Sequence, residues 1–101
     1  MQGLLADRVA MVTGAGRGLG RAHALALARA GARVLVNDLD AAAAAEVCGE
    51  ITRLGGDALP DSANVTDPPA VGRMVAAALR RWGQVDILVN NAGILRDRTF
   101  A

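Results

Sequence analysis

The chain has 101 residues, of which 52% are hydrophobic and 21% charged, so it is long enough for one globular domain and too apolar to be disordered. Its net charge is only +1 and its arginines are scattered, which excludes the basic patch of a nucleic-acid-binding protein. A single cysteine, Cys48, excludes an internal disulfide and a cysteine-based metal cluster.

No run of about 18 consecutive apolar residues is present, so the sequence predicts no membrane span. Residues 1–8 lack the apolar core of a signal peptide. We therefore expect a cytoplasmic protein with no membrane partner and no metal.

Strand and helix patterns alternate from the N-terminus onward. Residues 8–13 and 33–37 are apolar runs, as expected for strands of a parallel sheet covered on both faces. Residues 19–30 predict a helix, and 41–54 predict a second helix with Asp40 as its N-cap. The apolar spacing predicts these buried residues, in chain order: Leu19, Ala22, Ala26 and Ala30, then Ala44, Val47, Ile51 and Leu54.

The alternation continues through the second half. A third strand is expected within residues 57–64, where Pro60 and Asp61 favour a short edge strand. A third helix starts at Pro68, capped by Thr66 or Asp67. Its expected buried face steps by three and four through Val71, Met74, Val75, Ala78, Leu79 and Trp82.

Residues 85–90 are the fourth strand, which completes a βαβαβαβ order. Helices between successive apolar strands imply right-handed crossovers and a parallel sheet. The sequence thus predicts an α/β protein with strand order 3-2-1-4, the first half of a Rossmann-type doubly wound sheet.

Between the first strand and the first helix lies a glycine-rich turn with glycines at positions 14, 16, 18 and 20. A helix N-terminus offers unpaired N–H groups and a partial positive charge, and glycines let a pyrophosphate approach the backbone. The turn therefore predicts a phosphate-binding site, although a purely structural strand-to-helix turn would have the same glycines. His23, inside the helix, has no carboxylate or cysteine partner at motif spacing and is expected to be structural.

Two charged residues bear on which dinucleotide would bind. Asp38 ends the second strand, where a carboxylate accepts hydrogen bonds from the adenosine ribose hydroxyls and repels a 2′-phosphate. Arg17 argues the other way, because a guanidinium suits a 2′-phosphate. We give Asp38 the greater weight, which predicts NAD rather than NADP.

Three runs together resemble the short-chain dehydrogenase/reductase superfamily: residues 13–20, residues 64–67 (Asn-Val-Thr-Asp) and residues 90–93 (Asn-Asn-Ala-Gly). Residues 93–98, with 36–39, are similar to the hydroxyacyl-CoA dehydrogenase part of peroxisomal multifunctional enzymes. Residues 64–68 look equally like 3-oxoacyl-carrier-protein reductases. The resemblance implies hydride transfer between NAD(H) and an alcohol or ketone, including a 3-hydroxyacyl thioester, by a parent enzyme that is a homo-oligomer.

The resemblance also implies roles for individual residues. The glycine turn would line the pyrophosphate and ribose, Asp38 would hold the adenosine ribose, and Asn90 would tie the fourth strand to the sheet. Asn64 and Val65 would flank the adenine, where many relatives have Asp at the first position. The full set of expected cofactor-binding residues is Gly14, Ala15, Gly16, Arg17, Gly18, Leu19, Gly20, Asp38, Asn64, Val65, Asn91, Ala92 and Gly93.

Catalysis in the superfamily resembles a proton relay that uses a Tyr-x-x-x-Lys pair and a Ser. This chain contains no Tyr, and all of its 11 basic residues are Arg. We therefore expect residues 1–101 to be the N-terminal, cofactor-binding part of a single Rossmann domain, truncated before the catalytic segment, with no catalytic residue and no activity alone. The alternative is a non-catalytic short protein that binds a nucleotide or pairs its open sheet edge with another chain.

Overall fold

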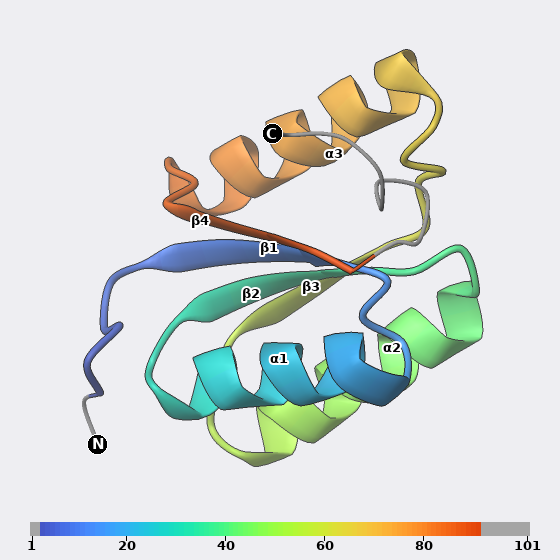
Figure 1. The fold of residues 1–101 in the computed structure, drawn as a ribbon. Helices are drawn as coiled ribbons and strands as arrows, with labels where there is room; N and C mark the ends of the chain where they lie inside the picture. The colour runs from blue at the N-terminus through green and yellow to red at the C-terminus, as the bar shows by residue number, and fades with distance from the viewer. Residues whose placement is uncertain (1–2, 92–101) are drawn as a thin grey trace.

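The computed structural model describes residues 3–91 and shows one parallel four-stranded sheet in the order β3-β2-β1-β4. The strands are β1 (Val9–Thr13), β2 (Arg33–Asn37), β3 (Ala58–Asp61) and β4 (Ile87–Asn90), and the helices are α1 (Gly18–Arg29), α2 (Ala41–Arg53) and α3 (Pro68–Trp82). In Figure 1, α1 and α2 cover one face of the sheet and α3 covers the other. The predicted fold class, element order and strand order are confirmed.

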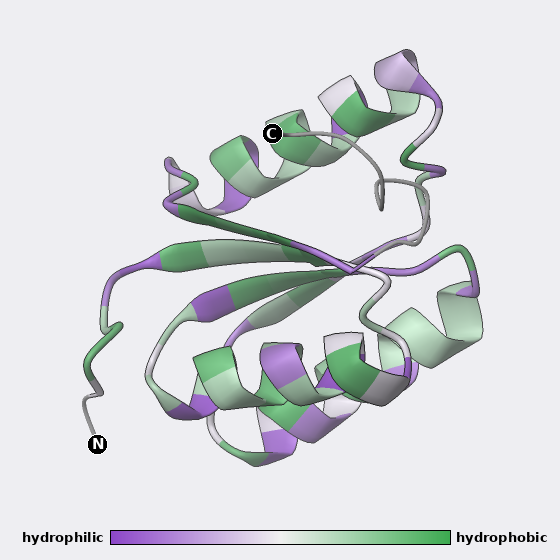
Figure 2. Ribbon diagram, in the orientation of Figure 1, coloured by the Kyte–Doolittle hydropathy of each residue, from purple (hydrophilic) through white to green (hydrophobic). Residues whose placement is uncertain are grey.

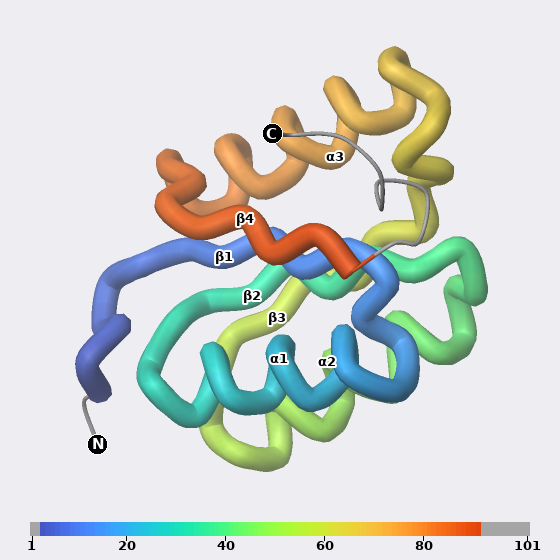
Figure 3. Tube along the Cα trace, viewed as in Figure 1, coloured from blue at the N-terminus to red at the C-terminus, as the bar shows by residue number. Residues whose placement is uncertain are grey.

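The carboxyl ends of the strands meet at one edge of the sheet. Thr13 pairs in register with Asn90, and Asn37 pairs with Asp61, so the last residues of all four strands lie together. The traced chain shows β1 between β2 and β4 (Figure 3). A doubly wound sheet binds its ligands at this edge, where crossovers leave to opposite sides.

Two apolar clusters hold the layers together. Val12, Val34 and Val36 pack toward α1 and α2, whereas Met11 and Leu35 pack with Met74 and Ala78 of α3. The apolar residues follow the strands and the inner sides of the helices, and polar residues mark the outer sides (Figure 2). The alternation of side chains along β1 and β2 thus supplies both cores.

The predicted inner face of α1 was wrong. Leu19 is 68% exposed, and the buried residues of α1 are Gly20, Ala24 and Leu25. Alanines occur on every side of this helix, so their spacing alone could not indicate which side packs. Gly20 indicates the packing side, because its lack of a Cβ lets the side of α1 that carries it lie against the glycine turn.

The predicted faces of the other helices were correct apart from one exposed leucine each, Leu54 after α2 and Leu79 in α3. Ala44, Val47 and Ile51 are buried in α2, but Leu54 follows the helix and is 52% exposed. Leu79 is 46% exposed, although it continues the apolar spacing of α3. Within residues 3–91, β4 is an edge strand, and Leu88 on it is 62% exposed.

Candidate functional site

The glycine turn connects β1 to α1 at the carboxyl edge of the sheet. Gly14 and Gly18 both have a backbone φ of 60°, which residues with a Cβ rarely adopt. At Gly20, a Cβ would lie 1.9 Å from the carbonyl oxygen of Gly14, so the helix can approach the turn this closely only with glycine there. The backbone N–H of Ala15 donates to the carbonyl of Asn37 at 2.8 Å, which fixes the turn against β2.

The N-terminus of α1 is open toward the surface. Arg17 is its N-cap residue, and among the described residues no side chain caps the helix and no acidic residue lies in its first turn. Arg17, Gly18 and Leu19 are all exposed. N–H groups at the positive end of a helix dipole fit a phosphate, so the phosphate site at this turn stays a prediction that the open helix end allows.

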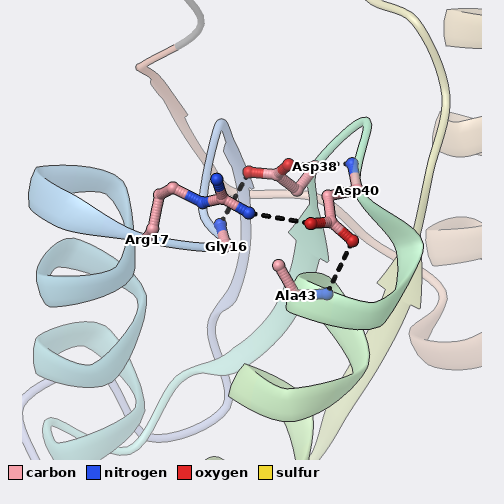
Figure 4. Close-up of polar contacts among 5 residues, drawn as sticks. All are labelled: Gly16, Arg17, Asp38, Asp40 and Ala43. Carbon is pink, nitrogen blue, oxygen red and sulfur yellow. Dashed lines mark hydrogen bonds and ion pairs between the residues drawn. The ribbon is translucent and has the colours of Figure 1, made fainter.

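Asp38 lies over the turn at the end of β2. Its Oδ2 accepts a hydrogen bond from the N–H of Gly16 at 2.9 Å, and its Oδ1 accepts one from the N–H of Asp40 at 2.9 Å (Figure 4). A Cβ on Gly16 would come within 2.8 Å of this carboxylate and 2.7 Å of the Ala43 methyl group. Glycine 16 therefore allows Asp38 to reach the backbone of the turn.

Arg17 is paired with Asp40 and not with Asp38. One guanidinium nitrogen of Arg17 lies 2.8 Å from Oδ2 of Asp40, while Oδ1 of Asp40 accepts the N–H of Ala43 at 3.1 Å and caps α2 (Figure 4). The Ala43 N–H lowers the pKa of Asp40 below its usual value, and Arg17 adds to this against the opposing effect of burial. The sequence indicated Asp40 only as a helix cap; its place two residues after Asp38 was the available signal that it belongs to this site.

Asn64 and Val65 follow β3 at the same edge. The side-chain oxygen of Asn64 accepts hydrogen bonds from the N–H of Thr66 at 2.9 Å and from its hydroxyl at 2.7 Å. A hydrogen bond to an adenine amino group would have to replace one of these. A hollow of about 350 Å³ next to this loop is lined by Asp61, Ser62, Ala63, Asn64, Ala70 and Arg73.

The end of β4 is joined to β1 through Thr13. The Thr13 hydroxyl donates to Oδ1 of Asn90 at 2.7 Å, and the N–H of Asn91 donates to the Thr13 hydroxyl oxygen at 3.1 Å. The expected role of Asn90 in tying β4 to the sheet thus agrees with the structure. The side-chain nitrogen of Asn91 is buried and has no partner among the described residues. Ala92 and Gly93 lie outside the described residues.

A larger hollow lies at the opposite edge of the sheet. It has a volume of about 520 Å³ and is bordered by the ends of α1 and α2, with Arg29, Arg33 and Asp57 in its lining. Helix C-termini present carbonyl groups there instead of the free N–H groups of a helix N-terminus, and neither the glycine turn nor Asp38 lies in its lining. Size alone therefore does not identify the ligand site in this molecule.

No group of three or more potential metal ligands occurs within residues 3–91, and none of the helices there has the length and apolar character needed to cross a membrane. Burial raises the pKa of the Cys48 thiol to about 11, so this cysteine is protonated and unreactive at neutral pH. The side-chain Nδ1 of His23 is buried and has no hydrogen-bond partner among the described residues.

The pattern of the family described as short chain dehydrogenase matches residues 8–101, which include all the strands and helices described above. The chain belongs to the short-chain dehydrogenase family. The resemblance predicted from the glycine turn, the loop after β3 and the end of β4 is confirmed.

Similar proteins include both narrower groups that the sequence resembles. Identity is 53% over 93 residues to a peroxisomal hydratase-dehydrogenase-epimerase of Neurospora crassa, covering 92% of this chain and 10% of that protein. Identity is 50% over 103 residues to the peroxisomal multifunctional enzyme type 2 of Mus musculus, and the match covers 93% of this chain and 14% of that protein. Identity is 46% over 94 residues to a 3-oxoacyl-(acyl-carrier-protein) reductase of Synechocystis, and the match covers 92% of this chain and 38% of that protein. The chain therefore spans 10% to 38% of the length of these relatives.

Solved structures of the short-chain dehydrogenase family share the fold. A short chain dehydrogenase from Mycobacterium avium superposes with a TM-score of 0.88 at 48% identity, covering 96% of this chain and 37% of that one. A 7α-hydroxysteroid dehydrogenase in complex with NADH and 7-oxo glycochenodeoxycholic acid gives a TM-score of 0.86 at 43% identity. The match covers 88% of this chain and 35% of that one. This chain thus corresponds to the N-terminal, cofactor-binding portion of NAD(P)-dependent oxidoreductases.

Proposed function

We propose that this chain binds NAD at the β1–α1 turn and supplies the cofactor half of an oxidoreductase that transfers hydride between NAD(H) and an alcohol or ketone. The position of Asp38 carries the proposal, because its carboxylate lies over the glycine turn and is held there by the N–H groups of Gly16 and Asp40. When bound, NAD supplies the hydride-accepting ring. The residues of this chain bind the phosphates with backbone N–H groups and the adenosine ribose with Asp38.

The comparisons support this proposal at a coarser level. One related structure holds NADH, but one relative is named L-rhamnose 1-dehydrogenase (NAD(P)(+)), so both cofactors occur among similar proteins. Relatives that act in acyl metabolism by name suggest a 3-hydroxyacyl thioester as the substrate class of the parent enzyme. Two relatives are named as peroxisomal, and the cytoplasmic location expected from the sequence stays a prediction.

Isothermal titration calorimetry of the chain with NAD and NADP tests the proposal. We expect NAD to bind about tenfold more tightly than NADP, since a carboxylate beside a 2′-phosphate costs on the order of 1 kcal/mol per charge pair even in water. Asp38→Asn keeps an acceptor oxygen for Gly16 and should narrow this difference. Glu46→Gln, which removes an exposed charge elsewhere on α2, should not. A folded wild-type chain that binds neither dinucleotide would refute the proposal.

A further inference from the structure

We propose that Asp40 is a specificity-determining residue of this site, because it engages the guanidinium of Arg17 and so withholds that cation from a 2′-phosphate. The inference rests on the proposed function, namely dinucleotide binding at the β1–α1 turn. It explains how the basic residue of the turn can coexist with a preference for NAD.

The geometry of Asp40 is fixed from two sides. Its backbone N–H donates to Asp38 at 2.9 Å, and one of its carboxylate oxygens accepts the N–H of Ala43 at 3.1 Å. The other oxygen is the one that receives Arg17, at 2.8 Å (Figure 4). Asp40 thus does not need to change its rotamer or leave its capping position to hold the guanidinium.

The charges at the turn show what this pairing does. Asp38 and Asp40 are both acidic, and among the ion pairs within residues 3–91 Arg17 is the cation that pairs with either of them, at Asp40, so the net charge of these three side chains is −1. Without Asp40, Arg17 would balance Asp38 and would be open to a phosphate. The Arg17 and Asp40 side chains are 71% and 49% exposed, so the pair is solvated and its effect on binding is modest.

Calorimetry on Asp40→Asn tests the inference. Asparagine is as good an N-cap as aspartate, so α2 stays capped while the ion pair is lost. We expect the affinity for NADP relative to NAD to rise about twofold to fivefold, the range that corresponds to one exposed ion pair. The change should shrink in high salt because exposed charges are screened. Glu46→Gln serves as the charge-matched control and should leave the ratio unchanged.

A double-mutant cycle that combines Asp40→Asn with Arg17→Ala shows whether Asp40 acts on the NADP/NAD affinity ratio through Arg17. If Asp40 acts through Arg17, Asp40→Asn should have little effect on the ratio once Arg17 is removed. An equal effect in both backgrounds, or an unchanged ratio in a wild-type background that binds NAD, would overturn the inference and leave the proposed function standing. Wild-type chain that binds neither dinucleotide would overturn both. Circular dichroism melts check folding, and Asp40→Ser, which also caps a helix, replaces Asp40→Asn if that variant does not fold.

Discussion

At the scale of single residues, the site depends on positions where a methyl group would not fit. Gly20 lies against the Gly14 carbonyl, and Gly16 lies against Asp38 and Ala43. These contacts join three pieces of chain that are separate in sequence: the turn, the end of β2 and the start of α2. The glycines are therefore needed for the site to assemble, before any ligand is considered.

Gly20→Ala should destabilise the fold by about 1–3 kcal/mol, because the new Cβ meets a backbone oxygen that cannot move without opening the turn. Gly72→Ala is the matched control on α3, where a Cβ would find no atom of the described chain within 4 Å. That change should instead stabilise the fold by about 0.5–1 kcal/mol, since alanine loses less conformational entropy in a helix. Urea denaturation measures both, and equal effects of the two substitutions would contradict this account.

The ion pair between Arg17 and Asp40 is a residue-level contact that the sequence did not predict. The strand–turn–helix pattern and the terminal Asp38 predicted a dinucleotide site, and the structure brings them together through the Gly16 N–H. From the residues alone, Asp38 received the greater weight over Arg17. The contact of Arg17 with Asp40 was not predicted, because it depends on α2 beginning beside the turn.

At the scale of helices and strands, apolar runs predicted β1, β2 and β4, whereas β3 (Ala58–Asp61) could be expected only within residues 57–64 because Pro60 and Asp61 interrupt its apolar pattern. The inner face of α1 was not predictable in the same way, since alanine fits both a core and a surface. The packing side is set by contacts with the turn, which are tertiary. Helix α3 was clearer because Met74 and Trp82 are large enough to mark one side.

Asp57 connects α3 to the segment before β3. Its carboxylate accepts hydrogen bonds from the Trp82 indole N–H at 2.7 Å and from Arg81 at 2.6 Å. Burial tends to raise the pKa of Asp57, but these hydrogen bonds outweigh it and lower the pKa below its usual value. Because the folded pKa is the lower one, the ionised carboxylate stabilises the fold above the unfolded pKa, and this is lost as the pH falls through the folded pKa.

Asp57→Asn should therefore cost about 1–2 kcal/mol near pH 7, allowing for the partial exposure of the group. The difference from wild type should begin to shrink as the pH falls below about 4, the usual pKa of the carboxylate in the unfolded chain, and should vanish once the pH is below the lowered pKa of the folded state. Urea denaturation at a series of pH values measures it. Asp67→Asn, at an N-cap where the side chain accepts no capping hydrogen bond, should change stability little at any pH. A pH-independent loss in Asp57→Asn would show that the charge of Asp57 is not what stabilises the contact.

At the scale of the whole molecule, the sheet brings the predicted binding residues to one edge, while the Tyr-x-x-x-Lys pair that the family resemblance implies for proton transfer is not found in the sequence. Backbone N–H groups of the turn, Asp38 and the end of β4 all lie at the carboxyl ends of the strands. Tyr is absent from the 101 residues, and every basic residue apart from His23 is an arginine. Arginine stays protonated at neutral pH, so it cannot exchange a proton with a substrate.

The 101-residue chain should consequently bind NAD without oxidising an alcohol. Binding and catalysis separate here because general acid–base catalysis typically contributes a factor of about 10² to 10⁴, and it needs a group that titrates within hydrogen-bond reach of the substrate. The measurement is the appearance of NADH absorbance when the chain is mixed with NAD and a short 3-hydroxyacyl thioester, with a full-length reductase of the family as positive control. Turnover by the purified chain that is lost in Asp38→Asn would contradict the prediction, because it would locate catalysis at this half-site. NAD binding with no turnover would mean that the strands and the turn suffice to hold the cofactor, and that holding it is separable from the proton transfer that turnover requires.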